Sequence, residues 1–448
     1  MMMRARKVMT IAGSDSSGGA GIQADIKTFA ALGVYGTSVL TAITAQNSYG
    51  VHEVHEVPAD VLDAQIAAIM EDNGLKVDYA KTGMLYSAAT IEVVANAFKR
   101  YKIPFVLDPV MKAGSGGALI EEDALTILIE QLLPLCTVVT PNVPEARVLS
   151  GMAIQSKEDA KEAALKIQKM GASAVIIKGG HLEQELAAGK ATDVLYHNGE
   201  FAEISSPVIR TERIVHGGGC SYSAALAAEL AKGEPLRDAA TSAKQFVHDA
   251  IVNGEEVSSL IVVNQMQRVR NDADRYFVLE NVKEAVRILK AIEGFELVIP
   301  EVGTNIGMAI ESAKSEQDVA AVDGRIVRMK EGIAAGCVGF GASSHVARLV
   351  LAMMERDRAQ RSAMNVQNSP EVVEACEELG MRVASFERAH EPAAVKTMDW
   401  GVREASREFV PEVIFDLGAV GKEPMVRIFG HTAVEVAGKA KQIVATLE

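Results

Sequence analysis

The stretch His216-Gly217-Gly218-Gly219-Cys220-Ser221-Tyr222-Ser223-Ala224-Ala225 decides most about the fold of this chain. Glycines carry no Cβ, so several backbone N–H groups can point into one small volume. The apolar, alanine-rich residues that follow, up to Leu230 and closed by Gly233, predict a helix. Because unpaired N–H groups and the positive end of the helix dipole meet at its N-terminus, the segment is a candidate anion site.

Cys220 lies where this helix would begin, and there the dipole would stabilise a thiolate and lower the pKa of the thiol. An anion site that also holds a proton acceptor is typical of phosphoryl transfer. The same segment is equally compatible with a flexible loop that carries a buried structural cysteine, so the rest of the chain must decide between the two.

The composition is that of a soluble globular protein. The 448 residues suffice for two or three domains, with 48% hydrophobic and 23% charged residues. A net charge of −14 and a pI near 5.3 argue against nucleic acid as the main partner. The four cysteines are far apart, without CxxC spacing, which argues against a disulfide framework or a zinc site and predicts a reducing, cytoplasmic location.

Neither a leader nor a membrane segment is expected. Residues 1–7 are basic, but the apolar run that follows breaks at Gly13-Ser14-Asp15, too early for a signal peptide. Residues 28–51 carry no charge, yet they are rich in Gly, Thr, Ser, Gln and Asn. That composition predicts protein interior, not a membrane span.

Short β-branched runs alternate with amphipathic helical patterns over the first 262 residues. The predicted buried strands are Val8–Ala12, Phe105–Leu107, Val138–Thr140 and Val175–Ile177. Between them, Ala160, Ala164, Ile167 and Met170 recur at helical spacing, up to Gly171. This alternation predicts an α/β fold with a mainly parallel sheet covered by helices.

Polar clusters directly follow each of these strands. They are Gly13-Ser14-Asp15, Asp108-Pro109-Val110-Met111, Pro141-Asn142 and Lys178-Gly179-Gly180. In parallel sheets ligands bind beyond the carboxyl ends of the strands, so four such clusters at one edge predict one site.

A polar segment at residues 264–274 is the expected linker to a second, smaller α/β domain. A helix with Leu279, Val282, Val286 and Leu289 on one face should follow it. Further strands are predicted at Leu297–Ile299, Ser362–Val366, Arg382–Ser385, Val413–Leu417 and Val426–Phe429.

The first 263 residues resemble the hydroxymethylpyrimidine/phosphomethylpyrimidine kinases of thiamine biosynthesis, which have a ribokinase-like fold. The order and spacing of several motifs carry the resemblance. They are Thr10-Ile11-Ala12-Gly13-Ser14-Asp15-Ser16-Ser17-Gly18-Gly19-Ala20-Gly21-Ile22-Gln23-Ala24-Asp25, Thr44-Ala45-Gln46-Asn47, Gly83-Met84-Leu85, Leu107-Asp108-Pro109-Val110-Met111, Thr140-Pro141-Asn142-Val143-Pro144-Glu145-Ala146 and Lys178-Gly179-Gly180-His181.

A small aminopyrimidine needs a flat, mostly apolar slot with a few placed hydrogen bonds. Gln46 offers an amide that could pair with the ring nitrogen and the amino group, and Gly13, Met84 and Val110 would supply the walls. Asp25 could accept a hydrogen bond from the hydroxymethyl group. The alternative for Asp25 is a carboxylate near the start of a helix, stabilised by the dipole.

The nucleotide requires cations and N–H groups. Lys178, Asn142 and the run Gly217, Gly218 and Gly219 are the expected contacts to the phosphates of ATP. Asp108 and Glu145 could hold Mg²⁺, directly or through water. The resemblance implies that Cys220 accepts the proton of the substrate hydroxyl, with the anion site and the cations lowering more of the barrier.

One position departs from the family pattern. The family usually shows Gly-Thr-Gly-Cys, and here Gly218 replaces the threonine. The backbone N–H donors remain, but a hydroxyl donor is lost. This loss puts in doubt the rate of the kinase more than its identity.

Residues 275–448 resemble the ThiN-type thiamine-phosphate synthase module. Three motifs carry this resemblance: Glu301-Val302-Gly303-Thr304-Asn305-Ile306-Gly307, Asp323-Gly324-Arg325-Ile326 and Gly339-Phe340-Gly341-Ala342-Ser343-Ser344-His345-Val346-Ala347-Arg348. The implied reaction joins the pyrimidine diphosphate made by the kinase to thiazole phosphate and expels pyrophosphate.

A departing pyrophosphate needs cations and N–H groups around it. Arg325 offers a planar fork suited to phosphate oxygens, and His345 could donate to phosphate or act as a general acid–base near neutral pH. Without the resemblance, Arg325 would be read as a surface residue and His345 as a helix-capping side chain.

Two alternative functions stay open. The C-terminal module could be a sensor of thiamine phosphates, although no basic helix-turn-helix candidate accompanies it. The kinase could instead act on pyridoxal, since that activity shares the fold and related motifs. The expected partners are small molecules, and the resemblance implies a homodimer or higher homo-oligomer.

Overall fold

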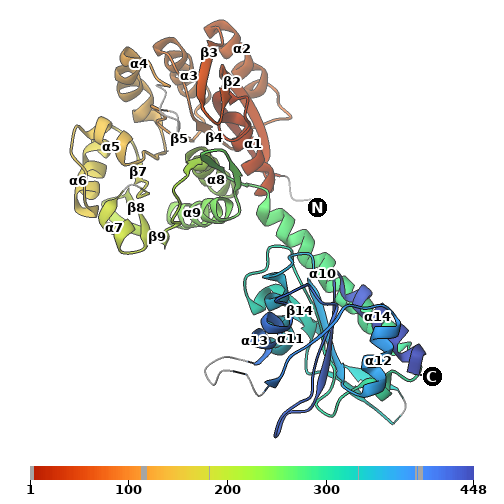
Figure 1. Cartoon of the computed structure of the whole chain (residues 1–448). Helices are drawn as coiled ribbons and strands as arrows, with labels where there is room; N and C mark the ends of the chain where they lie inside the picture. Colours follow the sequence, from red (N-terminus) through yellow and green to blue (C-terminus); the bar gives the residue numbers. More distant parts are fainter. Residues whose placement is uncertain are drawn as a thin grey trace. The chain divides into compact units, whose positions relative to one another are not determined.

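The computed structural model describes residues 5–112, 119–180, 182–330, 332–388, 391 and 397–447. The chain divides into an N-terminal unit, Met1–Arg268, and a C-terminal unit, Val269–Glu448 (Figure 1). This division falls inside the segment 264–274 that was expected to link two domains.

The N-terminal unit is built on a nine-stranded sheet with the order β3-β2-β1-β4-β5-β6-β7-β8-β9. Strands β2, β1, β4, β5, β6 and β7 run parallel, and β3, β8 and β9 are antiparallel to their neighbours. In sheet order the strands are Gly50–Glu56, Tyr35–Asn47, Lys7–Asp15, Tyr79–Thr82, Phe105–Leu107, Val138–Val139, Ala174–Ile177, Lys190–His197 and Glu200–Pro207. The prediction of a mainly parallel sheet is therefore confirmed, including the four strands identified in the sequence.

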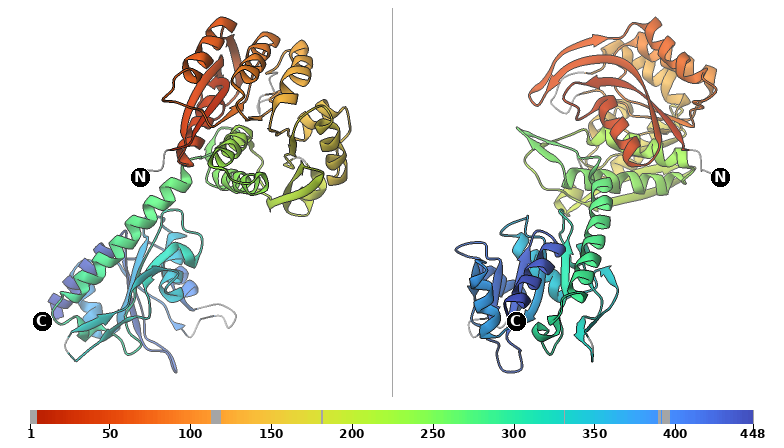
Figure 2. Two further views of the ribbon diagram at one scale, coloured as in Figure 1. Left: turned by 180° about the vertical axis from the view of Figure 1, so that it is seen from behind. Right: turned by 90° about the vertical axis from the view of Figure 1, so that its right-hand side faces the viewer.

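Helices cover both faces of this sheet (Figure 2). One face packs against α1 (Gly21–Ala31), α8 (Gly218–Lys232) and α9 (Leu236–Val252). The other face packs against α2 (Ala59–Met70), α3 (Ala88–Tyr101), α4 (Glu122–Ile127), α5 (Val143–Ser150) and α6 (Lys157–Gln168). Successive strand residues point to opposite faces, so Val106 packs with the first set and Phe105 and Leu107 with the second.

Smaller elements complete the unit. Strands β10 (Ile214–His216), β12 (Leu260–Val262) and β11 (Glu255–Val257) form a three-stranded sheet in that order. Helix α7 spans Glu183–Ala187, a π-helix spans Leu128–Leu132 and a 3₁₀ turn spans Leu133–Leu135. Because β10 leads directly into α8, the small sheet fixes the start of the glycine run.

The C-terminal unit has a seven-stranded sheet with the order β17-β14-β13-β18-β21-β20-β19. Only β19 and β20 are parallel to each other. In sheet order the strands are Val338–Phe340, Val319–Val322, Ile306–Ala309, Ser362–Gln367, Met425–Gly430, Val413–Asp416 and Val383–Ser385. Strands β15 (Ile326–Arg328) and β16 (Ile333–Ala335) form a separate hairpin.

Helices pack on both faces of this sheet as well. One core lies beneath α10 (Gln267–Lys290), α12 (Pro370–Glu378) and α14 (Ala433–Leu447). The other core lies beneath α11 (Ser344–Met354) and α13 (Thr397–Ala405). A second α/β domain was expected, and the antiparallel sheet with helices on each face fits that description.

Two local predictions differ from the structure. Leu297–Ile299 is not a strand: residues Phe295–Val298 form a 3₁₀ turn, because Phe295 and Val298 insert into the core at a spacing of three. The polar segment 264–274 is not an extended linker, since α10 already begins at Gln267. Its polar residues lie on a solvated helical surface, which hydropathy alone does not distinguish from a loop.

Among the described residues, no helix is long and apolar enough to cross a membrane. The uncharged stretch at residues 28–51 comprises the end of α1, the whole of β2 and the first residues of β3.

Candidate active sites

A cavity of about 1000 Å³ opens at the carboxyl ends of the parallel strands of the N-terminal unit. It brings together all the predicted residues of this unit except Asp25. They are Gly13, Gln46, Met84, Asp108, Val110, Asn142, Glu145, Lys178, Gly217, Gly218, Gly219 and Cys220. The four polar clusters that follow predicted strands therefore do share one site.

Asp15 organises the loop between β1 and α1. It accepts hydrogen bonds from Ser17 N at 2.9 Å, Ser17 Oγ at 2.7 Å, Ala20 N at 2.8 Å and His216 Nε2 at 2.9 Å. Burial alone would raise the pKa of Asp15, but these hydrogen bonds, the one from His216 foremost, lower it to about 2. The carboxylate thus fastens the loop to the segment that precedes the glycine run.

Gly217 is required where this loop meets the glycine run. Its φ is +88°, and a Cβ there would lie 1.9 Å from the carbonyl oxygen of Gly19. The first helical residue is Gly218, so the free N–H groups of α8 begin at this close approach. A Cβ on Gly219 would lie 3.5 Å from Lys178 Nζ, which places that ammonium beside the anion site.

Two buried carboxyl groups lie next to Lys178. Asp108 Oδ1 is 3.0 Å from Lys178 Nζ, and Ser223 Oγ donates to Asp108 Oδ2 at 3.0 Å. Glu145 belongs to a capping box with Asn142: Asn142 Oδ1 accepts from Glu145 N, and Glu145 Oε2 accepts from Asn142 N, each at 2.8 Å. Burial and the charge of Asp108 raise the pKa of Glu145 to about 7, although Lys178 opposes the shift.

These carboxyl groups suit a divalent cation. No cluster of three or more His, Cys, Asp or Glu side chains that could hold a metal occurs in the described parts of the chain. A pair of carboxylates is nonetheless the usual protein contribution to a Mg²⁺ site, where phosphate oxygens and water complete the shell. The pKa of Glu145 is raised chiefly by burial and also by the charge of Asp108, and a bound cation would offset both effects.

The expected low pKa of Cys220 is wrong. Burial raises the pKa of the thiol to about 11, and the negative charges of Asp25 and Asp108 add to that effect. Lys81 and the backbone N–H of Gly21 act in the opposite direction without cancelling it. Desolvation is therefore the largest influence on this thiol and opposes the thiolate that the start of a helix suggested.

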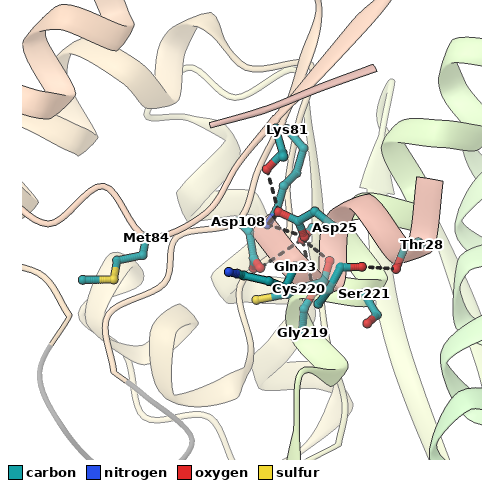
Figure 3. Close-up of polar contacts among 12 residues, drawn as sticks. Gln23, Asp25, Thr28, Lys81, Met84, Asp108, Gly219, Cys220 and Ser221 are labelled. Carbon is teal, nitrogen blue, oxygen red and sulfur yellow. Dashed lines mark hydrogen bonds and ion pairs between the residues drawn. The ribbon is translucent and has the colours of Figure 1, made fainter. Parts of the chain in front are cut away.

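The expected contact of Asp25 with the substrate is also not supported. Asp25 does not line the cavity, and its side chain is fully buried and paired with Lys81 on β4 (Figure 3). Lys81 does line the cavity and is a residue that the sequence analysis missed. The sequence feature that could have identified Lys81 is a single charged residue in the buried strand Tyr79-Ala80-Lys81-Thr82, next to the Gly83-Met84 motif.

The substrate wall is tightly assembled. A Cβ on Gly13 would lie 3.0 Å from Met84 Sδ, so the two predicted wall residues are in contact. The backbone of Gln46 is held through Ser16, whose Oγ accepts from Gln46 N at 2.9 Å and donates to Gln46 O at 2.8 Å. This anchors the strand that carries the Gln46 amide at the cavity.

In the C-terminal unit, positive charges gather around His345 near the start of α11. Burial and the nearby guanidinium groups of Arg427, Arg325, Arg348 and Arg388 lower the pKa of His345 to about 4. Arg325 is thus one of the charges that act on His345. The expectation that His345 titrates near neutral pH is wrong, because burial and the surrounding arginines both disfavour its protonation.

Asp416 binds two of these arginines. Arg427 Nη1 lies 2.7 Å from Asp416 Oδ2, and Arg388 holds the same carboxylate through Nε and Nη2, the latter at 3.0 Å. Arg427 and Asp416 expose no surface. Arg427 Nε and Nη2 have no hydrogen-bond partner among the described residues.

The strand register links this arginine pair to Arg325. Arg427 on β21 is opposite Asn365 on β18, and Asn365 Nδ2 donates to Gly303 O at 3.1 Å. A Cβ on Gly303 would lie 3.1 Å from Arg325 Cδ. The sequence analysis did not identify Arg427 as a site residue. The feature that could have identified it is a single charged residue within the apolar run Val426-Arg427-Ile428-Phe429.

Comparisons with known proteins match both units. The sequence model "Phosphomethylpyrimidine kinase" matches residues 15–263, and "Thiamine-phosphate synthase ThiN" matches residues 281–442. The bifunctional thiamine biosynthesis protein ThiDN of Methanocaldococcus jannaschii is 32% identical over 445 residues, which cover 97% of this chain and 98% of that protein.

The N-terminal unit also has relatives of its own. A hydroxymethylpyrimidine/phosphomethylpyrimidine kinase of Bacillus subtilis is 48% identical over 248 residues, covering 55% of this chain and 89% of that protein. The crystal structure of an ADP complex of Bacillus subtilis pyridoxal kinase superposes with a TM-score of 0.53 at 41% identity. It covers 59% of this chain and 98% of that one, and it confirms the expected kinase fold.

The relative that spans nearly the whole chain and the two sequence models agree on the order of the modules. The chain therefore belongs to the family of bifunctional thiamine-biosynthesis enzymes in which a phosphomethylpyrimidine kinase is followed by a ThiN-type thiamine-phosphate synthase.

Proposed function

We propose that the N-terminal unit uses ATP to phosphorylate 4-amino-5-hydroxymethyl-2-methylpyrimidine and then its monophosphate. The C-terminal unit then joins the resulting diphosphate to thiazole phosphate, which yields thiamine phosphate and pyrophosphate. The observation that supports the kinase assignment most directly is the single cavity lined by both the predicted pyrimidine contacts and the predicted phosphate contacts.

In the kinase, the pyrimidine lies between Gly13, Met84 and Val110, and the Gln46 amide pairs with its ring nitrogen and amino group. The N–H groups at the start of α8 and the ammonium of Lys178 bind the phosphates of ATP. The substrate oxygen bonds to the γ-phosphorus while the bond to the bridging oxygen breaks and ADP departs. The hydroxyl proton passes to the sulfur of Cys220 in its thiolate form.

Asp108 and Glu145 are the proposed holders of Mg²⁺, with Asn142 positioning Glu145 through the capping box. A bound cation supplies charge neutralisation to the phosphates. Because the pKa of Glu145 is about 7, binding of Mg²⁺ with ADP near neutral pH should release a proton. Calorimetry in two buffers of different ionisation enthalpy measures that release, which Glu145→Gln should abolish; an unchanged release would contradict the assignment.

In the synthase, Arg325 binds the departing pyrophosphate, and the N-terminus of α11 adds backbone N–H groups. His345 is neutral at pH 7, so it acts as a hydrogen-bond donor to phosphate. Arg325→Ala should abolish thiamine phosphate formation and leave binding of thiamine phosphate largely intact. The sensor alternative would be favoured if the unaltered chain has no synthase activity and Arg325→Ala loses the binding of thiamine phosphate.

A second candidate activity is phosphorylation of pyridoxal. It is favoured by the 41% identity to a structure described as a pyridoxal kinase. An assay in which pyridoxal and the aminopyrimidine compete for phosphorylation distinguishes the two candidate activities. The aminopyrimidine should have the higher kcat/KM.

The decisive experiment combines both reactions. Purified protein is given the hydroxymethylpyrimidine, ATP, Mg²⁺ and thiazole phosphate, and thiamine phosphate is followed as fluorescent thiochrome. Product formation without any added enzyme establishes both activities. Accumulation of the pyrimidine diphosphate alone would refute the synthase assignment.

We also propose a homodimer in the cytoplasm. The four cysteines are all unpaired, which suits a reducing compartment. Light scattering of the purified chain measures its mass against the 47.7 kDa of one copy.

A further inference from the structure

Lys81 and Asp25 form an ion pair that is enclosed within the N-terminal unit. Lys81 Nζ lies 2.9 Å from Asp25 Oδ2 and 3.0 Å from Oδ1, and neither side chain exposes any surface. Thr10 Oγ1 also donates to Asp25 Oδ2, at 2.6 Å. An ammonium has three hydrogens, so Asp25 leaves at least one of those of Lys81 unused.

The lysine end of this pair faces the cavity. Lys81 lines the cavity and Asp25 does not. A Cβ on Gly83 would lie 2.9 Å from Lys81 Nζ, so the ammonium lies against the segment that leads into the Met84 wall. Figure 3 shows Lys81, Asp25 and Cys220 gathered between the strands and the start of α8. Lys81 lines the cavity although its side chain exposes no surface, so its charge acts on the cavity from just behind the wall.

The other charges around Cys220 are the carboxylates of Asp25 and Asp108 and the ammonium of Lys178. Asp25 on α1 and Asp108 after β5 both raise the pKa of Cys220, and Lys81 lowers it. Burial lowers the pKa of the Lys81 ammonium, but the charges of Asp25, Cys220 and Asp108 together raise it above its ordinary value, so the ammonium is charged at neutral pH. Lys81 is thus a buried cation that acts on the proposed proton acceptor, as Lys178 also does.

Stability alone gives little reason for such a pair. Replacement of a buried ion pair by well-packed residues of similar volume is often neutral or stabilising. Removal of one partner is costly, because it leaves a buried charge without compensation. Stability therefore does not explain why a charge lies on this buried central strand.

We propose that Lys81, held by Asp25, supplies the positive charge that stabilises the negative charge developing on the substrate's alcohol oxygen and on Cys220 during phosphoryl transfer. This role rests on the proposed kinase activity of the same cavity. Lys81 acts through its charge and gives up no proton. Asp25 is a positioning residue that fixes the ammonium.

The test removes the charge without leaving half of the pair buried. The full-length double variant Lys81→Met/Asp25→Asn keeps the volumes and the acceptor for Thr10. It should fold, bind Mg²⁺–ADP with the affinity of the unaltered chain, and lose at least about 100-fold in kcat for the aminopyrimidine with little change in KM. Thr10→Val is the matched control: it removes a hydrogen bond to Asp25, keeps Lys81 charged, and should retain kcat within about threefold.

The opposite results would overturn the proposal. A double variant that is folded and has a kcat within about threefold of the unaltered chain would make the pair structural. If ADP binding becomes weaker and KM rises in parallel with the loss of kcat, the cause is a deformed cavity and not the missing charge.

A second readout needs no substrate. The rate at which iodoacetamide alkylates Cys220 between pH 7 and pH 10, located by mass spectrometry, reports the stability of its thiolate. Alkylation should be slower in the double variant at every pH, and equal or faster alkylation would refute the charge effect. If the unaltered chain fails to phosphorylate the aminopyrimidine, the proposed function fails, while this rate still decides the role of Lys81.

Discussion

His216 Nε2 lies 2.9 Å from Asp15 Oδ2 and so joins two strand ends that are 201 positions apart in the chain. Asp15 is the last residue of β1 and His216 the last residue of β10, and both line the cavity. This hydrogen bond fixes the pyrimidine side of the cavity relative to the phosphate side.

Replacement of Asp15 by Asn should destabilise the N-terminal unit by about 2 kcal/mol, because several donors lose a charged acceptor. The pKa of Asp15 is lowered from 3.8 to about 2 in the folded protein, so its contribution is present above pH 3.8 and is lost as the pH falls through about 2. Urea denaturation should show a constant difference from pH 7 to pH 4 that shrinks below pH 4. Ser17→Ala, which removes one donor, should cost about 1 kcal/mol, and a difference independent of acid pH would contradict the assignment.

Replacement of Cys220 by Ala should matter more as the pH rises. Because the pKa of the thiol is about 11, the thiolate fraction grows about tenfold per pH unit between pH 7 and pH 9. The kcat of the unaltered kinase should rise accordingly, while the kcat of Cys220→Ala stays flat. Steady-state rates with saturating ATP and aminopyrimidine measure both profiles. Identical slopes would show that Cys220 does not take the proton.

Gly218→Ser should restore the hydroxyl that the family's threonine supplies. A Cβ at this position would lie 3.3 Å from Val215 Cγ1, a close contact that a small shift of the valine accommodates. One added hydrogen bond of about 1 kcal/mol predicts a rise of about fivefold in kcat/KM for ATP. Gly218→Ala should bring no gain, whereas Gly217→Ala should be severely impaired because its Cβ meets the Gly19 carbonyl oxygen. An equal gain for alanine and serine at position 218 would rule out the hydroxyl as the cause.

Asp416→Asn should destabilise the C-terminal unit by about 3–5 kcal/mol, since Arg388 and Arg427 would be left buried without a counter-charge. Calorimetric unfolding of the full chain measures the loss. The matched control is Glu355→Gln, which breaks the half-exposed pair with Arg403 and should cost less than about 1 kcal/mol. Similar losses for both variants would show that burial does not set the strength of the Asp416 pairs.

The sequence was most informative about backbone and least informative about electrostatics. Short runs such as Phe105–Leu107 could be predicted as strands because they are buried on both faces and followed by turn residues. The polar residues after these strands could be placed together because parallel strands bring their carboxyl ends to one edge. This reasoning located the cavity, including Lys178 and Glu145.

The errors arose where burial and distant charges decide the outcome. The pKa of Cys220 depends on desolvation and on Asp25 and Asp108, which lie 195 and 112 positions away in the sequence. His345 is kept neutral by burial and by arginines, of which Arg427, Arg325 and Arg388 come from other segments. Lys81 and Arg427 are single charges within apolar strands, and only the folded chain shows the carboxylates that pair with them.

The burial of Cys220 has a consequence for how the enzyme withstands oxidants. Peroxide oxidises the thiolate of a cysteine far faster than the thiol, and a thiol with a pKa of about 11 is almost entirely protonated in a neutral cell. The kinase can therefore hold a cysteine in its active site without becoming a sensor of oxidative stress. Synthesis of the cofactor precursor would continue under conditions that already oxidise more acidic cysteines in other enzymes.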